Sequence, residues 1–189
     1  NERISLDLLA QNVLSESKKH ARINGGVSKP KDSVYTVIEF IFKNATTVFE
    51  REIKKINDGF FDEIFVLSGT ILTHRRKQII NYLKNRRNRV KKILLITTQV
   101  VEAGVDIDMD LGFKDSSLLD SDEQLAGRIN RNVNKDNCKL YLFNYSKESF
   151  IYGKDLRYEL TKQLSQEEKE SILNKKDFDY LYRRVIEFK

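Results

Sequence analysis

Hydrophobic and polar positions along this chain form two alternating kinds of segment. Short runs rich in Val, Ile, Leu, Phe and Tyr are typical of buried strands. The longer segments between them repeat apolar residues every three or four positions, as amphipathic helices do. One Pro and eight Gly in 189 residues leave few interruptions, so long regular elements are expected. The predicted strands cover residues 34–42, 64–67, 93–97, 109–113 and 140–143.

Polar residues mark where the intervening helices begin. Ser5 is a candidate N-cap for a helix over Leu6–Ala21. A Ser or Thr followed three residues later by Glu or Gln forms a capping box, and this pattern predicts helix starts at Thr47, Ser121 and Ser165. The predicted helices cover residues 6–21, 47–56, 74–88 and 121–131, and the chain becomes helical again after residue 147.

Strands that alternate with helices predict an α/β fold, with a parallel sheet and helices on both faces. We expect residues 33–147 to form this domain, residues 1–32 to lead into it as a helix and loop, and residues 148–189 to add a helical extension. In such sheets, function lies in loops at the carboxyl ends of the strands. Those loops are predicted at residues 68–73, 98–108, 114–121 and 144–149.

Composition narrows the class of protein. The chain carries 34 Lys and Arg against 28 Asp and Glu, a net charge of +6, and its length suits one domain with a small appendage. No uncharged stretch approaches a membrane span, and no signal peptide is evident, so we expect a cytoplasmic protein. One Cys and two His exclude a disulfide framework and a Cys-based zinc site. Because the chain begins at Asn1 and not at Met, we expect a piece of a longer protein.

Several familiar catalytic patterns are absent from the sequence. No G-x-x-x-x-G-K-[ST] is present, so the chain carries no phosphate-binding loop of its own. No His-Asp pair and no G-x-S-x-G nucleophile elbow occur either. Residues 106–117 begin like a calcium loop, but its sixth position, which should be Gly, is Leu111.

Two segments do carry a chemical signal. Residues 97–108, T-T-Q-V-V-E-A-G-V-D-I-D, directly follow a predicted buried strand, and residues 124–131, Q-L-A-G-R-I-N-R, lie on the helix predicted from Ser121. Arg128 and Arg131 are three residues apart, so we expect them on one helix face, where their guanidinium groups suit phosphate oxygens better than lysines would. Two surface arginines without a ligand are the alternative.

These segments resemble motifs V and VI in the second RecA-like domain of superfamily 2 helicases. The first matches T-x-x-x-x-x-G-x-D-[IL] and the second Q-x-x-G-R-x-x-R. Together with residues 67–76, L-S-G-T-I-L-T-H-R-R, which fit the motif IV region, they resemble the CRISPR-associated helicase–nuclease of type I interference systems over residues 34–145. One position departs from the family, because most relatives have Arg where this chain has Leu125. The matching positions are Thr98, Gly104, Asp106, Ile107, Gln124, Gly127, Arg128 and Arg131.

The resemblance implies a RecA-like sheet with C-terminal helices and a site for ATP and Mg²⁺ shared with a first RecA-like domain. That missing domain would supply the phosphate loop and the metal ligands, so none is expected in this chain. The implied catalytic residues are Arg128 and Arg131 as arginine fingers, with Gln124 orienting them. Gly104, Asp106 and Gly127 would contact the nucleotide. Asp106 as a turn cap and Gln124 as a capping-box partner are the alternatives.

The resemblance also implies a track for single-stranded DNA. Ser68 and Thr98 would hydrogen-bond its phosphates, and Arg75 and Arg76 would extend the track, although much of the basic cluster around them would be a solvated helix face. The implied partners are the first RecA-like domain, a nuclease domain in the same protein or a partner chain, and a guide-RNA surveillance complex, with no membrane.

The function implied is that of the second motor domain of an ATP-dependent single-strand DNA translocase in CRISPR antiviral defence, moving 3′ to 5′. Two alternatives remain open: a generic superfamily 2 helicase acting on RNA or duplex DNA, and a catalytically silent nucleic-acid-binding module with the same fold. A flanking or partner sequence with a phosphate loop would distinguish them.

Overall fold

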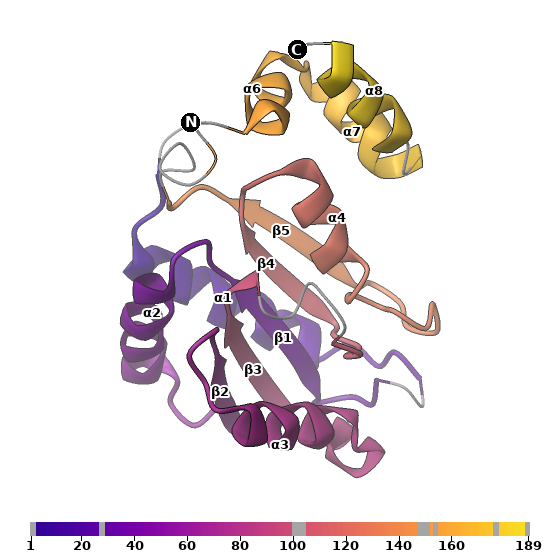
Figure 1. Ribbon diagram of the computed structural model, residues 1–189. Coiled ribbons are helices and arrows are strands. Elements are labelled where there is room, and N and C mark those ends of the chain that lie inside the picture. Colours follow the sequence, from indigo (N-terminus) through magenta and orange to yellow (C-terminus); the bar gives the residue numbers. More distant parts are fainter. Residues whose placement is uncertain are drawn as a thin grey trace.

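Five parallel strands form the central sheet of the computed structural model (Figure 1). The structure describes residues 3–26, 29–99, 105–146, 152, 155–175 and 178–187. The strand order is β2-β3-β1-β4-β5, so β1, whose six residues are all buried, lies at the centre. The predicted parallel α/β fold is confirmed. The strands are β1 (Val34–Glu39), β2 (Glu63–Leu67), β3 (Lys92–Thr97), β4 (Leu111–Asp115) and β5 (Lys139–Phe143).

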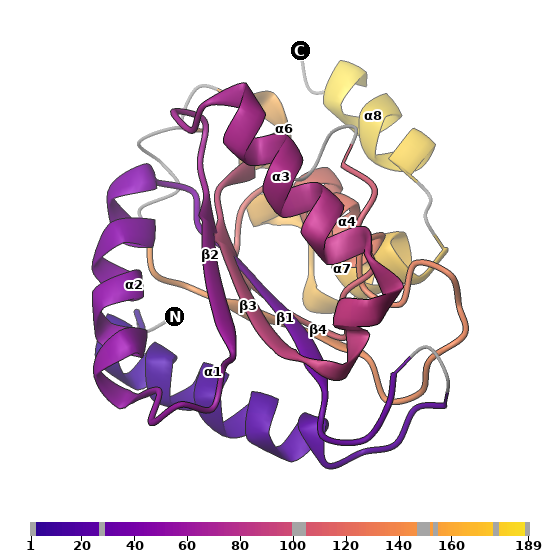
Figure 2. The same ribbon diagram turned by 90° about the horizontal axis from the view of Figure 1, so that it is seen from below.

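Helices cover both faces of this sheet (Figure 2). Helices α1 and α2 pack on one face, and α3 and α4 pack on the other. No helix in the described ranges is long and apolar enough to cross a membrane. The helices are α1 (Leu6–Ala21), α2 (Lys43–Ile56), α3 (Thr73–Lys84), the 3₁₀ helix η1 (Arg86–Val90), α4 (Leu119–Ala126), α6 (Leu156–Gln163), α7 (Gln166–Lys175) and α8 (Phe178–Glu187).

The two helix layers create two apolar cores that share the sheet. In β1, Val34 and Ile38 face α1 and α2, whereas Tyr35 and Val37 face α3 and α4. All four side chains are fully buried. A strand covered on both faces has to be apolar on both, which is why the central strands read as continuous apolar runs and not as alternating patterns.

The C-terminal helices form a small core of their own against α4. Leu119 of α4 packs with Leu160, Leu164, Ile172 and Leu181. The predicted capping box is present here, because the Glu168 carboxylate accepts from the Ser165 N–H at 2.8 Å and the Glu168 N–H donates to Ser165 Oγ at 3.1 Å. The division of the chain near residues 32 and 147 stays a prediction.

Among the first three helices, two predicted boundaries are wrong. Helix α2 begins at Lys43, with Phe42 extended before it, so Thr47 and Glu50 lie inside the helix and form no capping box. The helix predicted over residues 74–88 ends at Lys84. Asn85 then adopts an extended conformation, and its side-chain oxygen accepts from the Arg87 N–H at 3.0 Å, which starts η1. A local side-chain cap thus outcompetes continuation of the helix.

Candidate functional site

Strands β3 and β4 run in the same direction, so the segment between them joins opposite edges of the sheet. Strand β3 ends at Thr97 and the parallel strand β4 begins at Leu111, so the chain has to return from the carboxyl edge to the amino edge. Thr98 lies at the carboxyl edge, whereas Asp106 reaches the end of α3 at the amino edge. The prediction that residues 98–108 form one loop at the carboxyl edge is therefore wrong. Gly104 lies outside the described residues.

Buried and outward-facing side chains alternate over residues 105–109, and this alternation decides which of them can contact a ligand. Val105, Ile107 and Met109 are buried in the core beneath α3 and α4. Asp106 and Asp108 between them point outward. Such a two-residue period is typical of extended chain packed on an apolar layer. Strand β4 starts later than predicted, and Met109 forms an isolated parallel bridge with Ile129 instead.

That bridge ends α4 before the two arginines. The helix stops at Ala126 with Gly127 as its C-cap, so the predictions of a helix to residue 131 and of Arg128 and Arg131 on one helix face are wrong. The Met109 N–H donates to the Arg128 carbonyl at 2.8 Å, and the Asn130 N–H donates to the Met109 carbonyl at 2.9 Å. Backbone groups that would have extended the helix are thus used by the bridge.

The start of α4 and the packing of its turn also differ from the prediction. Leu118 is the N-cap of α4, so Ser121 and Gln124 form no capping box at its start. Ile129 rests on β4 at Gly112, where an added Cβ would lie 2.9 Å from Ile129 Cδ1 and 2.7 Å from Leu140 Cδ1. The turn after α4 can approach the sheet only because residue 112 has no side chain.

This arrangement brings Asp106 and the two arginines together from separate segments. Arg131 Nε lies 3.1 Å from Asp106 Oδ1, and Lys84 Nζ lies 3.1 Å from Asp106 Oδ2. The hydrogen bond from Lys84, together with the charges of Arg131 and Arg128, lowers the pKa of Asp106 below its ordinary value. Asp106 is therefore an ionised, exposed carboxylate beside two guanidinium groups at neutral pH.

Asp108, which the sequence reasoning did not select, organises the same turn. Its Oδ1 accepts from the Arg131 N–H at 2.9 Å, and its Oδ2 accepts from Asn132 Nδ2 at 3.2 Å. The turn-capping role considered for Asp106 thus belongs to Asp108. The alternation of aspartates at positions 106, 108 and 110 is the sequence signal that could have pointed to it.

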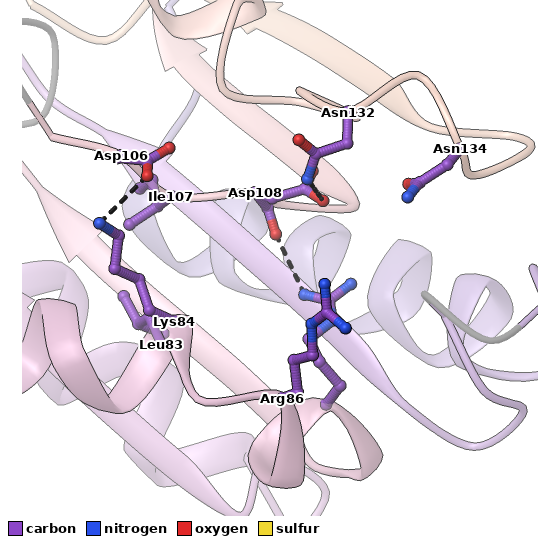
Figure 3. A pocket seen from close by; sticks show the side chains of 9 residues that line it. Leu83, Lys84, Arg86, Asp106, Ile107, Asp108, Asn132 and Asn134 are labelled. Atoms are coloured by element: carbon purple, nitrogen blue, oxygen red, sulfur yellow. Dashed lines mark hydrogen bonds and ion pairs between the residues drawn. The ribbon is translucent and has the colours of Figure 1, made fainter.

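A pocket of about 500 Å³ opens next to these residues (Figure 3). Lys84 reaches into it from the end of α3 to meet Asp106, and Asn132 meets Asp108 on its other side. Its walls combine positive, negative, amide and apolar groups, which suits a polar ligand that also has an apolar surface. The lining residues are Leu83, Lys84, Arg86, Arg89, Asp106, Ile107, Asp108, Asn132 and Asn134.

The other residues of the motif over residues 124–131 that lie on α4 or at its end differ in what they can contact. Gln124 is exposed, and its side chain makes no hydrogen bond with any residue in the described ranges. Leu125, in the position of the family arginine, is fully buried against the sheet and cannot reach a ligand. At Gly127 an added Cβ would meet only ordinary contacts at 3.6 Å, so the fold itself does not require glycine there.

A second group of predicted residues lies at the carboxyl edge. Ser68 follows β2 and Thr98 follows the neighbouring β3, and the Thr98 N–H approaches the Leu67 carbonyl at 3.4 Å. Arg75 and Arg76 lie near the start of α3, just after the loop that begins at Ser68. These four residues thus lie at the carboxyl edge, where α3 starts, whereas Asp106 and Arg131 lie beside its other end.

A family model described as "CRISPR-associated nuclease/helicase Cas3, C-terminal" matches residues 32–134, more than half of the chain. The CRISPR-associated nuclease/helicase Cas3 of Methanothermobacter thermautotrophicus is 33% identical over 98 residues, which are 49% of this chain and 12% of that protein. The chain therefore corresponds to a small part of its curated relative.

Solved helicase structures share the fold. The T. fusca Cas3–ADP structure matches with a TM-score of 0.63 and 16% identity over 96% of this chain and 23% of that one. T. fusca Cas3–AMPPNP matches with 0.57 and 16% identity over 82% and 20%. The DUF1998 helicase MrfA bound to DNA and AMPPNP matches with 0.54 and 16% identity over 97% and 21%. The predicted RecA-like fold is confirmed.

Proposed function

The chain belongs to the Cas3-like C-terminal family as the second RecA-like domain of CRISPR-associated nuclease/helicases, and we propose that it is half of an ATP-driven translocase for single-stranded DNA. The observation that carries the proposal is the convergence of Asp106, Arg128 and Arg131 from two separate segments on one exposed patch. In the proposed motor the other half is a first RecA-like domain, and a guide-RNA complex loads the DNA during antiviral defence.

The proposed nucleotide site fits ATP by its charges. The Arg131 side chain is 38% exposed, and its pair with Asp106 is a surface ion pair, worth about 0–1 kcal/mol. Its guanidinium can therefore exchange that carboxylate for phosphate oxygens at small cost. Phosphoryl transfer develops negative charge on the transferred group, and a positioned guanidinium stabilises that charge. We assign this role to Arg131 and Arg128, with Gln124 orienting them.

The other proposed contacts to the nucleotide come from an exposed carboxylate and from two glycines. Asp106, ionised and exposed, can accept hydrogen bonds from ribose hydroxyls. Gly127 and Gly104 would leave room for the nucleotide to approach the backbone. No three metal-ligating side chains converge in the part of the chain that the structure describes. The Mg²⁺ that neutralises phosphate charge would therefore be held by the first domain.

The chain on its own is expected not to hydrolyse ATP. It lacks the phosphate-loop lysine, and an arginine finger has nothing to stabilise where no phosphate is held. Phosphate release in the presence of single-stranded DNA measures this, with the complete protein as the positive control. Turnover by the purified chain that persists after Arg128→Ala would identify a different enzyme.

The carboxyl edge is the proposed DNA track. Ser68 and Thr98 place hydroxyls at the ends of adjacent strands, and Arg75 and Arg76 add charge next to them. Thr98 is half-buried, whereas Ser68 is buried and its Oγ lies 3.3 Å from Thr70 Oγ1, a contact that DNA binding would have to replace. With two to four phosphates contacted, the slope of log affinity against log salt should be about −1.5 to −3. Replacing Arg75 and Arg76 by Ala should make that slope shallower by about 1.4.

A matched control separates this track from general charge. Arg22, the C-cap of α1, and Arg51, on α2, are exposed arginines on the helix layer over the other face of the sheet. Their double Ala variant removes the same charge and should leave the slope within error of the unmodified chain. Fluorescence anisotropy with a labelled oligonucleotide at several salt concentrations gives both slopes. Equal slopes for the two double variants would argue against the track.

A generic superfamily 2 helicase is the second candidate. It is favoured by the fold match to MrfA, whose structure holds DNA and AMPPNP. Duplex unwinding in the absence of any guide-RNA complex would support this alternative over the CRISPR translocase.

A further inference from the structure

Lys135 is a buried lysine in a stretch that is otherwise polar and largely exposed. Its side chain is 0% exposed. Its ammonium group lies 2.7 Å from Asp108 Oδ1, 2.8 Å from Asp110 Oδ1 and 2.9 Å from the Met109 carbonyl oxygen. Two of the three N–H donors of this ammonium make hydrogen bonds within one short segment, and the Asp108 carboxylate adds an ion pair.

Asp110, at the other side of this lysine, is anchored in the sheet. Its carboxylate accepts from the Tyr35 N–H at 2.7 Å and from Arg89 Nη2 at 2.7 Å. Arg89 also donates to the Asp108 carbonyl at 3.0 Å, and its guanidinium stacks 4.0 Å from the centre of the Tyr35 ring. Asp110 therefore joins β1, η1 and the entry to β4 at one buried point.

Asp108 connects the buried Lys135 ammonium to the backbone of Arg131. The carboxylate oxygen that binds Lys135 also accepts the Arg131 N–H at 2.9 Å. The neighbouring turn contains Asn130 and Val133 with φ of 50° and 51°, a conformation that disfavours a β-branched residue. A turn with such strain needs outside contacts to hold it in one conformation.

The same contacts close the turn on itself. The Asn130 side chain accepts from the Lys135 N–H at 3.0 Å and donates to the Lys135 carbonyl at 2.7 Å. Lys135 therefore fixes the turn at both ends: its backbone holds Asn130, and its side chain holds Asp108 beneath Arg131.

We propose that Lys135 is a positioning residue that acts through Asp108 to hold Arg131 beside Asp106. This inference rests on the proposed finger role of Arg131 and adds a residue that neither touches the nucleotide nor lies in a helicase motif. Misplacing a catalytic group by about 1 Å can cost about 100-fold in rate. Lys135 thus controls turnover from the interior of the domain.

The kinetic test uses Lys135→Met in the complete protein, because Met keeps the length and removes the charge. DNA-stimulated kcat is expected to fall about 10- to 100-fold, with KM for ATP within about threefold of the unmodified enzyme. Asp108→Asn, which keeps an acceptor for the Arg131 N–H but loses the ion pair with Lys135, should give a smaller loss and guards against a misfolded Met variant. An unchanged kcat in both variants overturns the proposal.

A double variant shows whether the effect passes through Arg131. In an Arg131→Ala background, Lys135→Met should lower kcat by less than about twofold, because the group that it positions is already absent. The same 10- to 100-fold loss in that background would place the action of Lys135 elsewhere and overturn the proposal. If Arg131→Ala alone leaves kcat unchanged, the finger assignment fails. If Arg131→Ala lowers kcat but Lys135→Met leaves it unchanged, only the positioning role of Lys135 is rejected.

Hydrogen exchange gives a readout that is independent of turnover, and Lys114 provides the matched control. Lys114 is equally buried and pairs with Glu39 between β1 and β4, away from the turn. Lys135→Met should increase deuterium uptake in peptides covering residues 128–135, whereas Lys114→Met should leave them unchanged and keep kcat within about twofold. Unchanged uptake in the Lys135 variant would show that the turn is held by other contacts, against the proposal.

Discussion

Replacing Arg131 or Arg128 by alanine in the complete protein is expected to lower DNA-stimulated ATP turnover by about 10³–10⁵-fold, roughly 4–7 kcal/mol in the barrier. The Arg131 guanidinium lies 3.1 Å from Asp106 at the proposed nucleotide site, and the charge of Arg128 also acts on that carboxylate. Their charge should matter mainly when negative charge develops in the transition state. Nucleotide affinity should therefore change far less than turnover, and steady-state ATPase assays beside nucleotide titrations measure both.

Lysine is not expected to restore this activity. Its ammonium is a point charge and cannot reproduce the planar, two-pronged contact of a guanidinium with phosphate oxygens. Folding should survive either Ala substitution, because the Arg131 side chain is partly exposed and its ion pair with Asp106 lies at the surface. Arg22→Ala, at the C-cap of α1 over the other face of the sheet, is the control. Full turnover in both single variants and in the double variant would contradict the motor-domain proposal itself.

Asp110→Asn is expected to destabilise the chain by about 3–5 kcal/mol. The substitution keeps the shape and an acceptor for the Tyr35 N–H, but it removes the only charge that Asp110 offers to Arg89 and Lys135. Lys135 would then keep a single carboxylate partner among the described residues, Asp108. Urea denaturation of the chain measures the loss.

The acid dependence of stability provides a second test at Asp110. Burial by itself would raise its pKa, but the charges of Arg89 and Lys135 and the hydrogen bonds from Lys135 and Tyr35 outweigh burial and lower it. A carboxyl with a lowered folded-state pKa stabilises fully above its unfolded pKa, about 3.9, and loses that contribution as pH falls through the lower, folded value. Stability of the unmodified chain should therefore fall below about pH 4, and Asp110→Asn should lose this part of the fall.

An exposed aspartate at the same edge is the matched control. Asp62 also accepts a backbone N–H, from Lys92 at 2.7 Å, but lies in solvent at the entry to β2. Asp62→Asn should cost less than about 1 kcal/mol. An Asp110→Asn chain as stable as the Asp62→Asn chain would show that the buried charges are not needed.

The motif residues can be identified from the sequence, because residue types and spacing do not depend on how the chain folds between them. The arrangement of these residues in space cannot be identified in this way. Thr98 and Asp106 are eight residues apart and were expected in one loop, yet they lie at opposite edges of the sheet. A parallel connection has to run back along the sheet before the next strand can start. This requirement cannot be read from the sequence alone, because it applies only when the two strands are known to be parallel strands of one sheet.

The sequence by itself determined the alternation of strands and helices, and hence the parallel sheet, because buried strands and amphipathic helices leave different apolar periods. It did not determine where α4 ends, because helix propensity competes there with hydrogen bonds to Met109, a residue that becomes a neighbour only on folding. Nor did it reveal Asp108, Asp110 and Lys135 as a buried network. In the sequence they are ordinary charged residues. Only in the tertiary structure, where water around them is removed, do their ion pairs and hydrogen bonds link the interior to Arg131.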